Sequence, residues 1–456
     1  MGTYAVNTRE LILQILLMID EEGEHSHIAL GNVLSKYQFL PKQERAFITR
    51  VCEGTLEYRI RIDYILDYFS AVPVSRMKPV IREILRSAVY QLEYMDSVPD
   101  SAVCNEAVRL AQKKGFYNLK AFVNGVLRSV IRGRDQIEWP SGDDLPQSLS
   151  ISYSMPRFLV DRWLRDYGEE KTRAILEDFL RPPCTTVRCR PGKDSVDDIA
   201  KSLRAQGVTV EPASYLPYAL KISGYDHLYA LDAFREGKIV VQDVSSMLVG
   251  EVAAPKKGDY IIDLCAAPGG KSLHLGDMMS GYGTVDARDV SEYKTGLIEE
   301  NLSRTDIINV FPKVQDATVF DVESLLQADI LLADLPCSGY GVIGRKPEIK
   351  YRASQAKELE LVQLQRQILT CAADYVKPEG VLIYSTCTIS RVENEENMLW
   401  FRNHFPFVLE SLDPYLPPGL RTESTALGYL QLLPGVHGTD GFFMARFRRK
   451  LSVESS

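Results

Sequence analysis

The sequence lacks any hydrophobic run long enough to cross a membrane. Its longest apolar stretch near the start, Leu11 to Ile19, is interrupted by Gln14 and is followed by three acidic residues. A membrane-spanning helix needs about 20 apolar residues, and a cleaved signal peptide needs small residues where these acids stand. We interpret the stretch instead as one face of a buried amphipathic helix capped by Asn7 or Thr8, and we expect no membrane partner.

Metal-binding and disulfide patterns are also missing. The eight cysteines are scattered without a C-x-x-C pair, and the six histidines form no H-E-x-x-H motif. These spacings are typical of structural zinc sites and of zinc-dependent hydrolases. The sequence therefore predicts no metal and no disulfide scaffold, with a reducing cytoplasm as the compartment.

An excess of basic residues is missing as well. The chain has 61 Asp and Glu against 53 Lys and Arg, a net charge of −8, which argues against a protein that coats nucleic acid through uniform positive charge. The distribution of charge is more informative than its sum, because residues 1–140 hold 18 Lys and Arg against 17 Asp and Glu. The acidity therefore belongs to the later part of the chain.

The length of 456 residues corresponds to about three domains. Residues 7–133 carry helical periodicity, with further helices expected near 42–58, 60–69, 76–94, 101–113 and 119–132. A stretch rich in proline, glycine, serine and aspartate, residues 136–150, is typical of a linker. Residues 151–235 mix two expected helices, 156–167 and 169–180, with short strand-like pieces. We place the domains at 1–140, 141–235 and 236–450.

Strand-like and helical runs alternate from about residue 258. The expected strands are Tyr260–Leu264, Val285–Asp289, Val310–Val314, Ile330–Asp334 and Val381–Ser385, and the longest helix is expected at Gln355–Val376. A hairpin at the sheet edge is expected from the runs 429–433 and 442–447. Such alternation builds a parallel, doubly wound sheet. The sequence thus predicts a multidomain protein with an all-α start, a small α+β connector and an α/β Rossmann-like domain.

The first of these strands leads into a loop of small residues, Asp263–Ser272. Its ending, Gly270-Lys271-Ser272, resembles a phosphate-binding P-loop, but Cys265 occupies the position where that motif requires its first glycine. Small residues at a turn from strand to helix instead let a ligand approach the backbone. Asp289 lies 20 residues beyond Gly269, a spacing that suits a strand-end carboxylate bound to ribose hydroxyls.

Two more acids, Asp316 and Asp334, end or follow the next two strands. Ligands of parallel sheets bind at the carboxyl ends of the strands. A row of carboxylates there, without a phosphate-binding loop, suggests a cationic nucleoside. The sequence therefore predicts S-adenosyl-L-methionine as the cofactor.

Two cysteines follow neighbouring strand ends, Cys337 after Asp334 and Cys387 after Ser385. A lone cysteine is usually a small buried hydrophobe, which is our interpretation of most of the others. Two at one ligand edge favour covalent catalysis. Carbon 5 of a pyrimidine is a poor nucleophile, and adding a thiolate to carbon 6 makes an enamine-like ring that can accept a methyl group. Asp334 is placed to neutralise ring nitrogen 3.

At these residues the chain resembles the NOL1/NOP2/Sun family of RNA cytosine-5 methyltransferases. The resemblance rests on the loop and on both cysteine motifs, Asp334–Gly339 and Ser385–Thr388. The helical start, with Asn105–Val108 and Phe122–Arg128, is similar to the NusB-like domain of one bacterial branch, and 153–168 resembles its connecting segment. The resemblance implies methyl transfer to carbon 5 of a cytosine in 16S (small-subunit) ribosomal RNA, free or in an assembling particle, by a covalent adduct.

The resemblance also assigns roles to residues. Cys387 would be the nucleophile, Cys337 would help to release the product, and Asp334 would lie near the reacting centre. Asp289 would bind the ribose and Asp316 would lie near the adenine. The cofactor loop would comprise Cys265, Ala266, Ala267, Pro268, Gly269, Gly270 and Lys271.

A short basic segment, Val342–Arg352, follows the first cysteine motif. It carries a local charge of +3, and we expect Arg345, Lys346 and Lys350 to contact RNA phosphates, which supply affinity without sequence information. The target base has to leave any stack to reach Cys387. Two alternatives remain open: the same chemistry on transfer RNA, or a non-catalytic RNA-binding assembly or antitermination factor.

Overall fold

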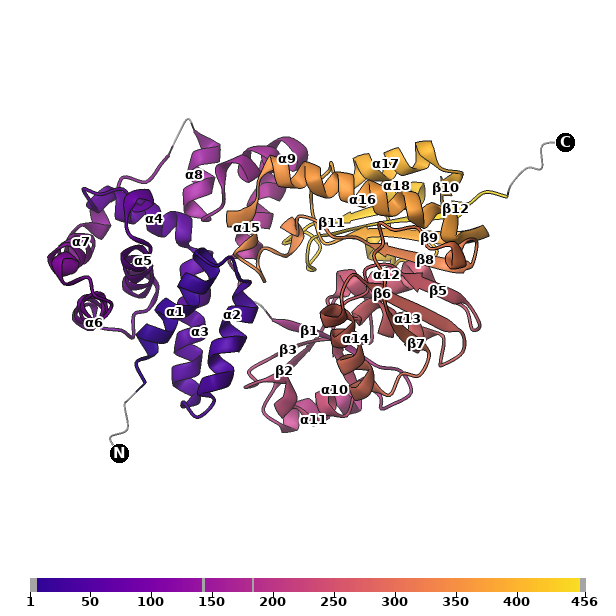
Figure 1. Cartoon of the computed structure of the whole chain (residues 1–456), viewed down its shortest axis with the longest axis horizontal. Helices are drawn as coiled ribbons and strands as arrows, with labels where there is room; N and C mark the ends of the chain where they lie inside the picture. Colours follow the sequence, from indigo (N-terminus) through magenta and orange to yellow (C-terminus); the bar gives the residue numbers. More distant parts are fainter. Residues whose placement is uncertain (1–5, 142–143, 183, 452–456) are drawn as a thin grey trace. The chain divides into compact units, whose positions relative to one another are not determined.

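The computed structural model describes residues 6–141, 144–182 and 184–451, so that residues 142 and 143 of the expected linker lie outside the described residues. Contacts divide the chain into two compact units (Figure 1). Unit 1 comprises Met1–Arg181 and Ile343–Arg352, and unit 2 comprises Pro182–Val342 and Ala353–Ser456. The expected connector, 141–235, is thus divided between the two units.

Unit 1 is helical. Its helices are α1 (Thr8–Asp20), α2 (Ser26–Leu34), α3 (Lys42–Glu57), α4 (Arg59–Phe69), α5 (Pro79–Tyr94), α6 (Asp100–Lys113), α7 (Lys120–Gly133), α8 (Leu145–Ser152), α9 (Arg157–Phe179) and the short α15 (Ile349–Arg352). The Asn7 side chain accepts from the amides of Arg9 and Glu10 and caps α1, one of the two caps expected. Apolar faces at helical spacing pack into one core across α1 to α7.

Helix α9 contains the break that the sequence predicts between 167 and 169. Gly168 has φ 78° and ψ 172°, a backbone conformation that only glycine adopts at low cost. The residues on either side therefore form two helical segments.

Unit 2 begins with a small antiparallel sheet. Its strands lie in the order β2-β3-β1-β4. The elements of this part are β1 (Thr185–Cys189), α10 (Val196–Ala205), β2 (Thr209–Pro212), β3 (Ala219–Ser223), α11 (Asp232–Arg235) and β4 (Ile239–Val241). Helix α10 packs with these strands over a core of its own.

A large mixed sheet forms the rest of unit 2, in the order β10-β12-β9-β8-β5-β6-β7, with β11 paired to β12. Strands β5 to β9 run parallel to one another, and β12 runs antiparallel to β9, β10 and β11. The strands are β5 (Tyr260–Asp263), β6 (Thr284–Asp289), β7 (Val310–Val314), β8 (Ala328–Asp334), β9 (Val376–Thr386), β10 (Phe407–Leu409), β11 (Tyr429–Leu432) and β12 (Phe442–Arg449).

Helices cover both faces of this sheet (Figure 1). One face packs against α12 (Val244–Ala253), α13 (Gly270–Met278) and α14 (Glu292–Thr305), and the other against α16 (Gln355–Tyr375) and α17 (Glu395–His404). The short α18 (Glu423–Leu427) precedes β11. Burial on both faces explains why the central strands are nearly continuous apolar runs.

The fold class predicted from the sequence is confirmed. All five expected parallel strands form, the long helix ends at Tyr375, and the expected hairpin is the β11–β12 pair. Parallel order brings the carboxyl ends of β5, β6, β8 and β9 to one edge of the sheet. Among the described residues, no helix is both long and apolar enough to span a membrane.

Candidate active site

The cofactor loop turns from β5 into α13. Gly269 has φ 103°, and a Cβ there would lie 3.0 Å from Leu273 and 3.1 Å from Ile298, so a larger residue would be strained and crowded. A Cβ on Gly270 would meet no atom within 4 Å in the part of the chain that the structure describes. The loop therefore has open space beside its backbone at the start of α13.

Asp263, the last residue of β5, is 1% exposed. Its Oδ2 accepts from Ser272 Oγ at 2.5 Å, while its Oδ1 has no hydrogen-bond partner among the described residues. Burial raises the pKa of Asp263 to about 7. An unsatisfied buried acceptor is unfavourable unless a ligand donates to it.

Asp289 lies at the end of β6 and binds the cofactor loop. Its carboxylate accepts from the backbone amide of Ala267 at 3.0 Å and from that of Val290 at 2.8 Å, and Lys294 lies 3.0 Å away. Asp316, after β7, accepts from the amide and hydroxyl of Thr318. These hydrogen bonds lower the pKa of Asp316. The ribose and adenine contacts assigned to these acids stay predictions.

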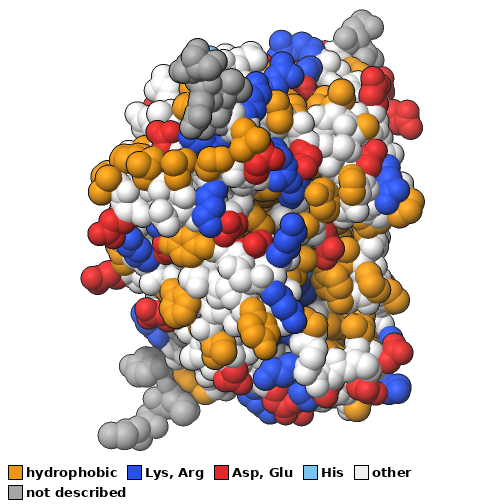
Figure 2. Space-filling model, turned by 90° about the vertical axis from the view of Figure 1, so that its right-hand side faces the viewer, with side chains coloured by type: hydrophobic (Ala, Val, Ile, Leu, Met, Phe, Trp, Pro, Cys, Tyr) orange, Lys and Arg blue, Asp and Glu red, His pale blue; other side chains and the backbone are white. Residues whose placement is uncertain are grey.

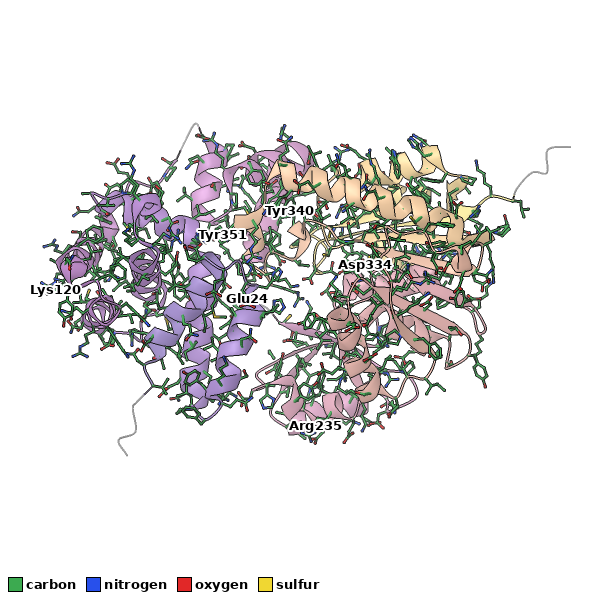
Figure 3. All side chains as sticks on the ribbon, viewed as in Figure 1. Glu24, Lys120, Arg235, Asp334, Tyr340 and Tyr351 are labelled. Atoms are coloured by element: carbon green, nitrogen blue, oxygen red, sulfur yellow. The ribbon has the colours of Figure 1, made fainter. Side chains whose placement is uncertain are left out.

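Asp334, labelled in Figure 3, ends β8 and is held on both oxygens. Lys271 Nζ lies 2.7 Å from Oδ2, and Ser385 Oγ donates to Oδ1 at 2.7 Å. Burial by itself lowers the pKa of Lys271, but Asp334, with smaller contributions from Asp263 and Cys387, raises it overall. The sequence placed Lys271 only in the cofactor loop and Ser385 only in the second cysteine motif, and it predicted neither contact with Asp334.

The two cysteines at the strand ends face each other. Cys337 Sγ and Cys387 Sγ are 3.3 Å apart. The hydrogen bond to Cys387, together with burial, raises the pKa of Cys337 well above its ordinary value. Cys337 is therefore a thiol at neutral pH and can donate to a thiolate at Cys387. Burial also raises the pKa of Cys265, in line with its interpretation as a turn residue.

A second layer of polar residues lies behind the thiols. Glu393 accepts from Ser338, the residue after Cys337, and Gln365 donates to Glu393. Sequence reasoning missed this layer because both residues lie far from the first cysteine motif in sequence. No group of three or more metal-ligating side chains occurs in the described ranges.

The basic segment after Cys337 divides into exposed and buried parts. Arg345 and Lys346 are exposed, and their predicted RNA contacts stay predictions. Lys350, in α15, is 3% exposed, and its ammonium donates to the Glu57 carbonyl at 2.7 Å. A phosphate has no access to that ammonium in this arrangement. The structure therefore does not support the RNA contact expected of Lys350, because a count of local charge does not reveal burial.

Most of the same segment, Ile343–Arg352, belongs to unit 1. Glu348 is 2% exposed and accepts from the Ser26 amide at 3.2 Å and hydroxyl at 2.9 Å. Arg352 donates to the carbonyl of Glu24, and Tyr351 donates to a carbonyl at the end of α3; Glu24 and Tyr351 are labelled in Figure 3. Elsewhere, on the face drawn in Figure 2, Lys and Arg side chains are interspersed with acidic and apolar ones.

Three family models match the chain. They are a 16S rRNA methyltransferase RsmB/F model over residues 251–448, a NusB family model over 6–132, and an RsmF/B-like ferredoxin-like domain model over 155–226. The first covers the loop and both cysteines, and the second confirms the NusB-like start that the sequence suggested.

Curated relatives match over nearly their whole length. A probable ribosomal RNA small subunit methyltransferase B of Bacillus subtilis is 35% identical over 97% of this chain and 99% of that protein. A ribosomal RNA small subunit methyltransferase B of Cronobacter sakazakii is 30% identical over 98% of this chain and 99% of that protein.

Solved structures agree with this match. The crystal structure of PH0851 has a TM-score of 0.82 and 28% identity, covering 98% of this chain and all of that one. NSun6 from Pyrococcus horikoshii, solved with SFG, has a TM-score of 0.58 and 22% identity, covering 65% of this chain and 99% of that one. At this identity the match shows similarity of fold alone. Family models, full-length relatives and a shared fold together show that this chain belongs to the RsmB/F family of 16S rRNA methyltransferases.

Proposed function

We propose that this protein transfers a methyl group from S-adenosyl-L-methionine to carbon 5 of a cytosine in small-subunit ribosomal RNA, through a covalent bond between Cys387 and carbon 6. The observation that carries the proposal is the pair of thiols, Cys337 and Cys387, with sulfurs 3.3 Å apart. They lie at the ends of strands whose neighbouring residues, Asp334 and Ser385, pair in register. One thiol can attack while the other donates a hydrogen bond to it.

The residues around the cofactor loop fit S-adenosylmethionine, which supplies an electrophilic methyl group. Asp263 offers a buried, unsatisfied carboxylate oxygen, and Gly270 leaves open space beside the backbone. Carboxylates at Asp263 and Asp289 suit a cationic ligand with an ammonium group and ribose hydroxyls. No phosphate-binding loop competes for this position, because Cys265 interrupts that motif.

Cys387 would form the bond to carbon 6 as a thiolate. Cys337 keeps its proton because its pKa is raised, so its S–H can stabilise the thiolate by hydrogen bonding. The charge of Cys387 is among the causes that raise the pKa of Lys271. The interaction is reciprocal, and the Lys271 ammonium therefore favours the Cys387 thiolate.

Asp334 would orient the target ring. Its two oxygens are held by Lys271 and Ser385, which leaves the carboxylate in one orientation. A carboxylate accepts hydrogen bonds from the amino group of cytosine and from a protonated nitrogen 3. A proton taken up from solvent at nitrogen 3 neutralises the negative charge that the attack on carbon 6 delivers into the ring.

Release would follow methyl transfer by elimination. The proton on carbon 5 passes to water, the carbon–carbon double bond re-forms, and the bond between carbon 6 and the Cys387 sulfur breaks with its electrons returning to sulfur. Nitrogen 3 then returns its proton to solvent. The Cys337 S–H then stabilises the departing thiolate by the same hydrogen bond. Cys337 thereby helps the thiolate to depart, and its removal slows turnover after methylation.

The proposal is tested with radiolabelled cofactor and small-subunit RNA. Label is expected in 5-methylcytosine for the unchanged protein, and none for Cys387→Ser. Cys337→Ala is expected to accumulate a protein–RNA adduct that survives denaturing electrophoresis. Label in 5-methylcytosine from the Cys387→Ser variant refutes the assigned nucleophile, and an absence of adduct with Cys337→Ala refutes the release role.

The substrate class is tested in the same assay. We infer that the NusB-like start helps to hold the ribosomal RNA, and that Arg345 and Lys346 contribute phosphate contacts. Transfer RNA is offered in parallel, and preferential labelling of transfer RNA overturns the ribosomal assignment. A protein that binds RNA but neither binds the cofactor in calorimetry nor methylates either RNA is instead a non-catalytic RNA-binding factor.

A further inference from the structure

A buried carboxylate holds the turn that carries Cys337. Glu393 is 0% exposed. One of its oxygens accepts from the Ser338 backbone amide at 2.9 Å, and the other accepts from the Ser338 hydroxyl at 2.5 Å. The carboxylate thus binds the residue next to Cys337 through both backbone and side chain.

The other side of Cys337 is held by the same network. Gln365, on α16, donates from Nε2 to the Pro336 carbonyl and to Glu393, each at 2.9 Å. The Gln365 oxygen accepts from Asn397 Nδ2 at 2.7 Å, which fixes the orientation of the amide. Residues before and after Cys337 are therefore bound to one buried polar cluster.

This cluster also contacts the strand end that carries Cys387. The hydroxyls of Ser338 and Thr388, the residue after Cys387, lie 2.7 Å apart. The Gly341 amide donates to the Cys387 carbonyl at 3.1 Å. The position of one sulfur relative to the other is thus set by hydrogen bonds on the flanking residues.

Stability alone does not account for a carboxylate at this position. Burial raises the pKa of Glu393, while the donors from Ser338 and Gln365 lower it. A buried ionisable group loses its hydration, and replacement by apolar residues of similar volume is often neutral or stabilising. A carboxylate that accepts three hydrogen bonds, by contrast, holds a turn in one geometry.

We propose that Glu393 is a positioning residue that holds the Cys337 thiol against Cys387 for product release. The inference rests on the proposed function, in which Cys387 attacks and Cys337 assists its departure. Glu393 touches neither the base nor the cofactor in this role, and acts through Ser338 and Gln365. Loss of its hydrogen bonds lets the turn relax and separates the two sulfurs.

The predicted defect therefore lies in release, not in attack. Asp334 keeps its contacts with Lys271 and Ser385 when Glu393 is changed, and the Cys387 thiol itself remains, so the first methyl transfer proceeds. Displacement of a catalytic group by about 1 Å is enough to slow a step on the order of a hundredfold. The covalent adduct then accumulates, as it does when Cys337 itself is removed.

The experiment compares Glu393→Ala and Glu393→Gln with Cys337→Ala. The full-length variants are incubated with S-adenosylmethionine and small-subunit RNA, the adduct is measured on denaturing gels, and methylation is followed in single and multiple turnovers. Glu393→Ala is expected to accumulate adduct and to lose multiple turnover. Glu393→Gln keeps one acceptor oxygen for Ser338 and is expected to release faster than Glu393→Ala.

A matched control removes a neighbouring buried charge that is bound to Ser390 instead of Ser338. Glu358, on α16, is 2% exposed and accepts from Ser390 Oγ at 2.6 Å. Glu358→Gln is expected to accumulate no adduct. Adding Cys387→Ser to Glu393→Ala is expected to abolish the adduct, which identifies the nucleophile in it.

The outcomes separate the two proposals. If Cys337→Ala traps adduct while both folded Glu393 variants lose methylation without trapping it, the positioning role is wrong and the release role of Cys337 stands. An equal level of adduct in Glu358→Gln also overturns the inference, because a nonspecific loss of domain stability then explains the adduct. If Cys337→Ala traps no adduct, the release step itself is wrong.

Discussion

The burial of Lys350 makes a quantitative prediction about the stability of unit 1. Lys350 is 3% exposed, and its side-chain nitrogen donates to the Glu57 carbonyl at 2.7 Å. Burial lowers the pKa of Lys350 from 10.5 to about 7, against a smaller opposing effect of the Glu57 carboxylate. The perturbation is Lys350→Met, which keeps a flexible chain of similar length and removes the ionisable group.

The sign follows from the proton balance. Between pH 7 and 10.5 the unfolded chain holds a proton on Lys350 that the folded chain has lost, so the free energy of unfolding rises with pH in this window. The slope from this one group is about 1.4 kcal/mol per pH unit. The full pKa difference of Lys350, between 10.5 in the unfolded chain and about 7 in the folded chain, corresponds to about 5 kcal/mol of unfolding free energy.

Two nearby acids also have perturbed pKa values, and their effect on the unfolding free energy has to be removed from the comparison. Burial raises the pKa of Glu53 to about 7 and also raises that of Glu57. Both remain in Lys350→Met. The difference in unfolding free energy between the two proteins therefore isolates Lys350, apart from its coupling to Glu57. We expect the unfolding free energy of the unchanged protein to increase relative to that of Lys350→Met as pH rises from 7 to 10.

The assay is denaturant unfolding of the full chain at several pH values. The sequence has three tryptophans. A Trp400→Phe background leaves Trp139 and Trp163, both in unit 1, as the fluorescent reporters. Lys346→Met is the control, because Lys346 is exposed on the same segment.

A pH-independent difference between the unchanged protein and Lys350→Met refutes the burial argument. RNA binding supplies a second, independent check. If Lys350 contacted a phosphate, its removal would weaken binding and reduce the salt dependence of the affinity by about one counterion. We expect Lys350→Met to leave that salt dependence unchanged.

Three further predictions concern unit 2. A Cβ on Gly341 would lie 2.0 Å from the Gly441 carbonyl oxygen, and Gly341→Ala is expected to lower the unfolding free energy by about 1–3 kcal/mol; an unchanged denaturation midpoint contradicts this. Hydrogen peroxide is expected to remove one hydrogen from each of the Cys337 and Cys387 thiols, giving water and a disulfide, since the sulfurs lie 3.3 Å apart against about 2.05 Å in the bond. Activity should return with dithiothreitol. If both thiols can still be alkylated after inactivation, the disulfide has not formed and the prediction is wrong. Asp289→Ala is expected to weaken S-adenosylmethionine binding roughly tenfold or more, because a charged acceptor of the cofactor-loop backbone is lost; equal affinity in calorimetry rules this out.

Much of the catalytic sheet could be predicted because its signals are local. Buried parallel strands are apolar on both faces, so runs such as Ile330–Asp334 and Val381–Ser385 coincide with parts of β8 and β9. The carboxyl ends of parallel strands share one edge, so strand order along the sequence was enough to place Asp334 and Cys387 together. Gly168 likewise marks a helix break through its own backbone preference.

The contacts that position these residues could not be predicted in the same way. Glu393 reaches Ser338 across 55 residues of sequence, and Lys350 reaches the Glu57 carbonyl across 293. Nothing in the local sequence distinguishes Lys350, which is buried, from Lys346, which is exposed four residues earlier. Side-chain partners of this kind depend on tertiary packing, and residue spacing carries no information about it.

The buried ionisable groups themselves argue for chemistry at this site. Asp263 and Glu393 have raised pKa values through burial, and Lys271 is held against Asp334. Each charge withdrawn from water is unfavourable unless it is fully paired, and Asp263 keeps one oxygen without a partner in the described chain. Replacement of such groups by apolar side chains of similar volume is often neutral or stabilising, so a domain retained only to bind RNA has no need of them. Such perturbed groups cluster where a reaction needs them, which supports methyl transfer over a non-catalytic RNA-binding role.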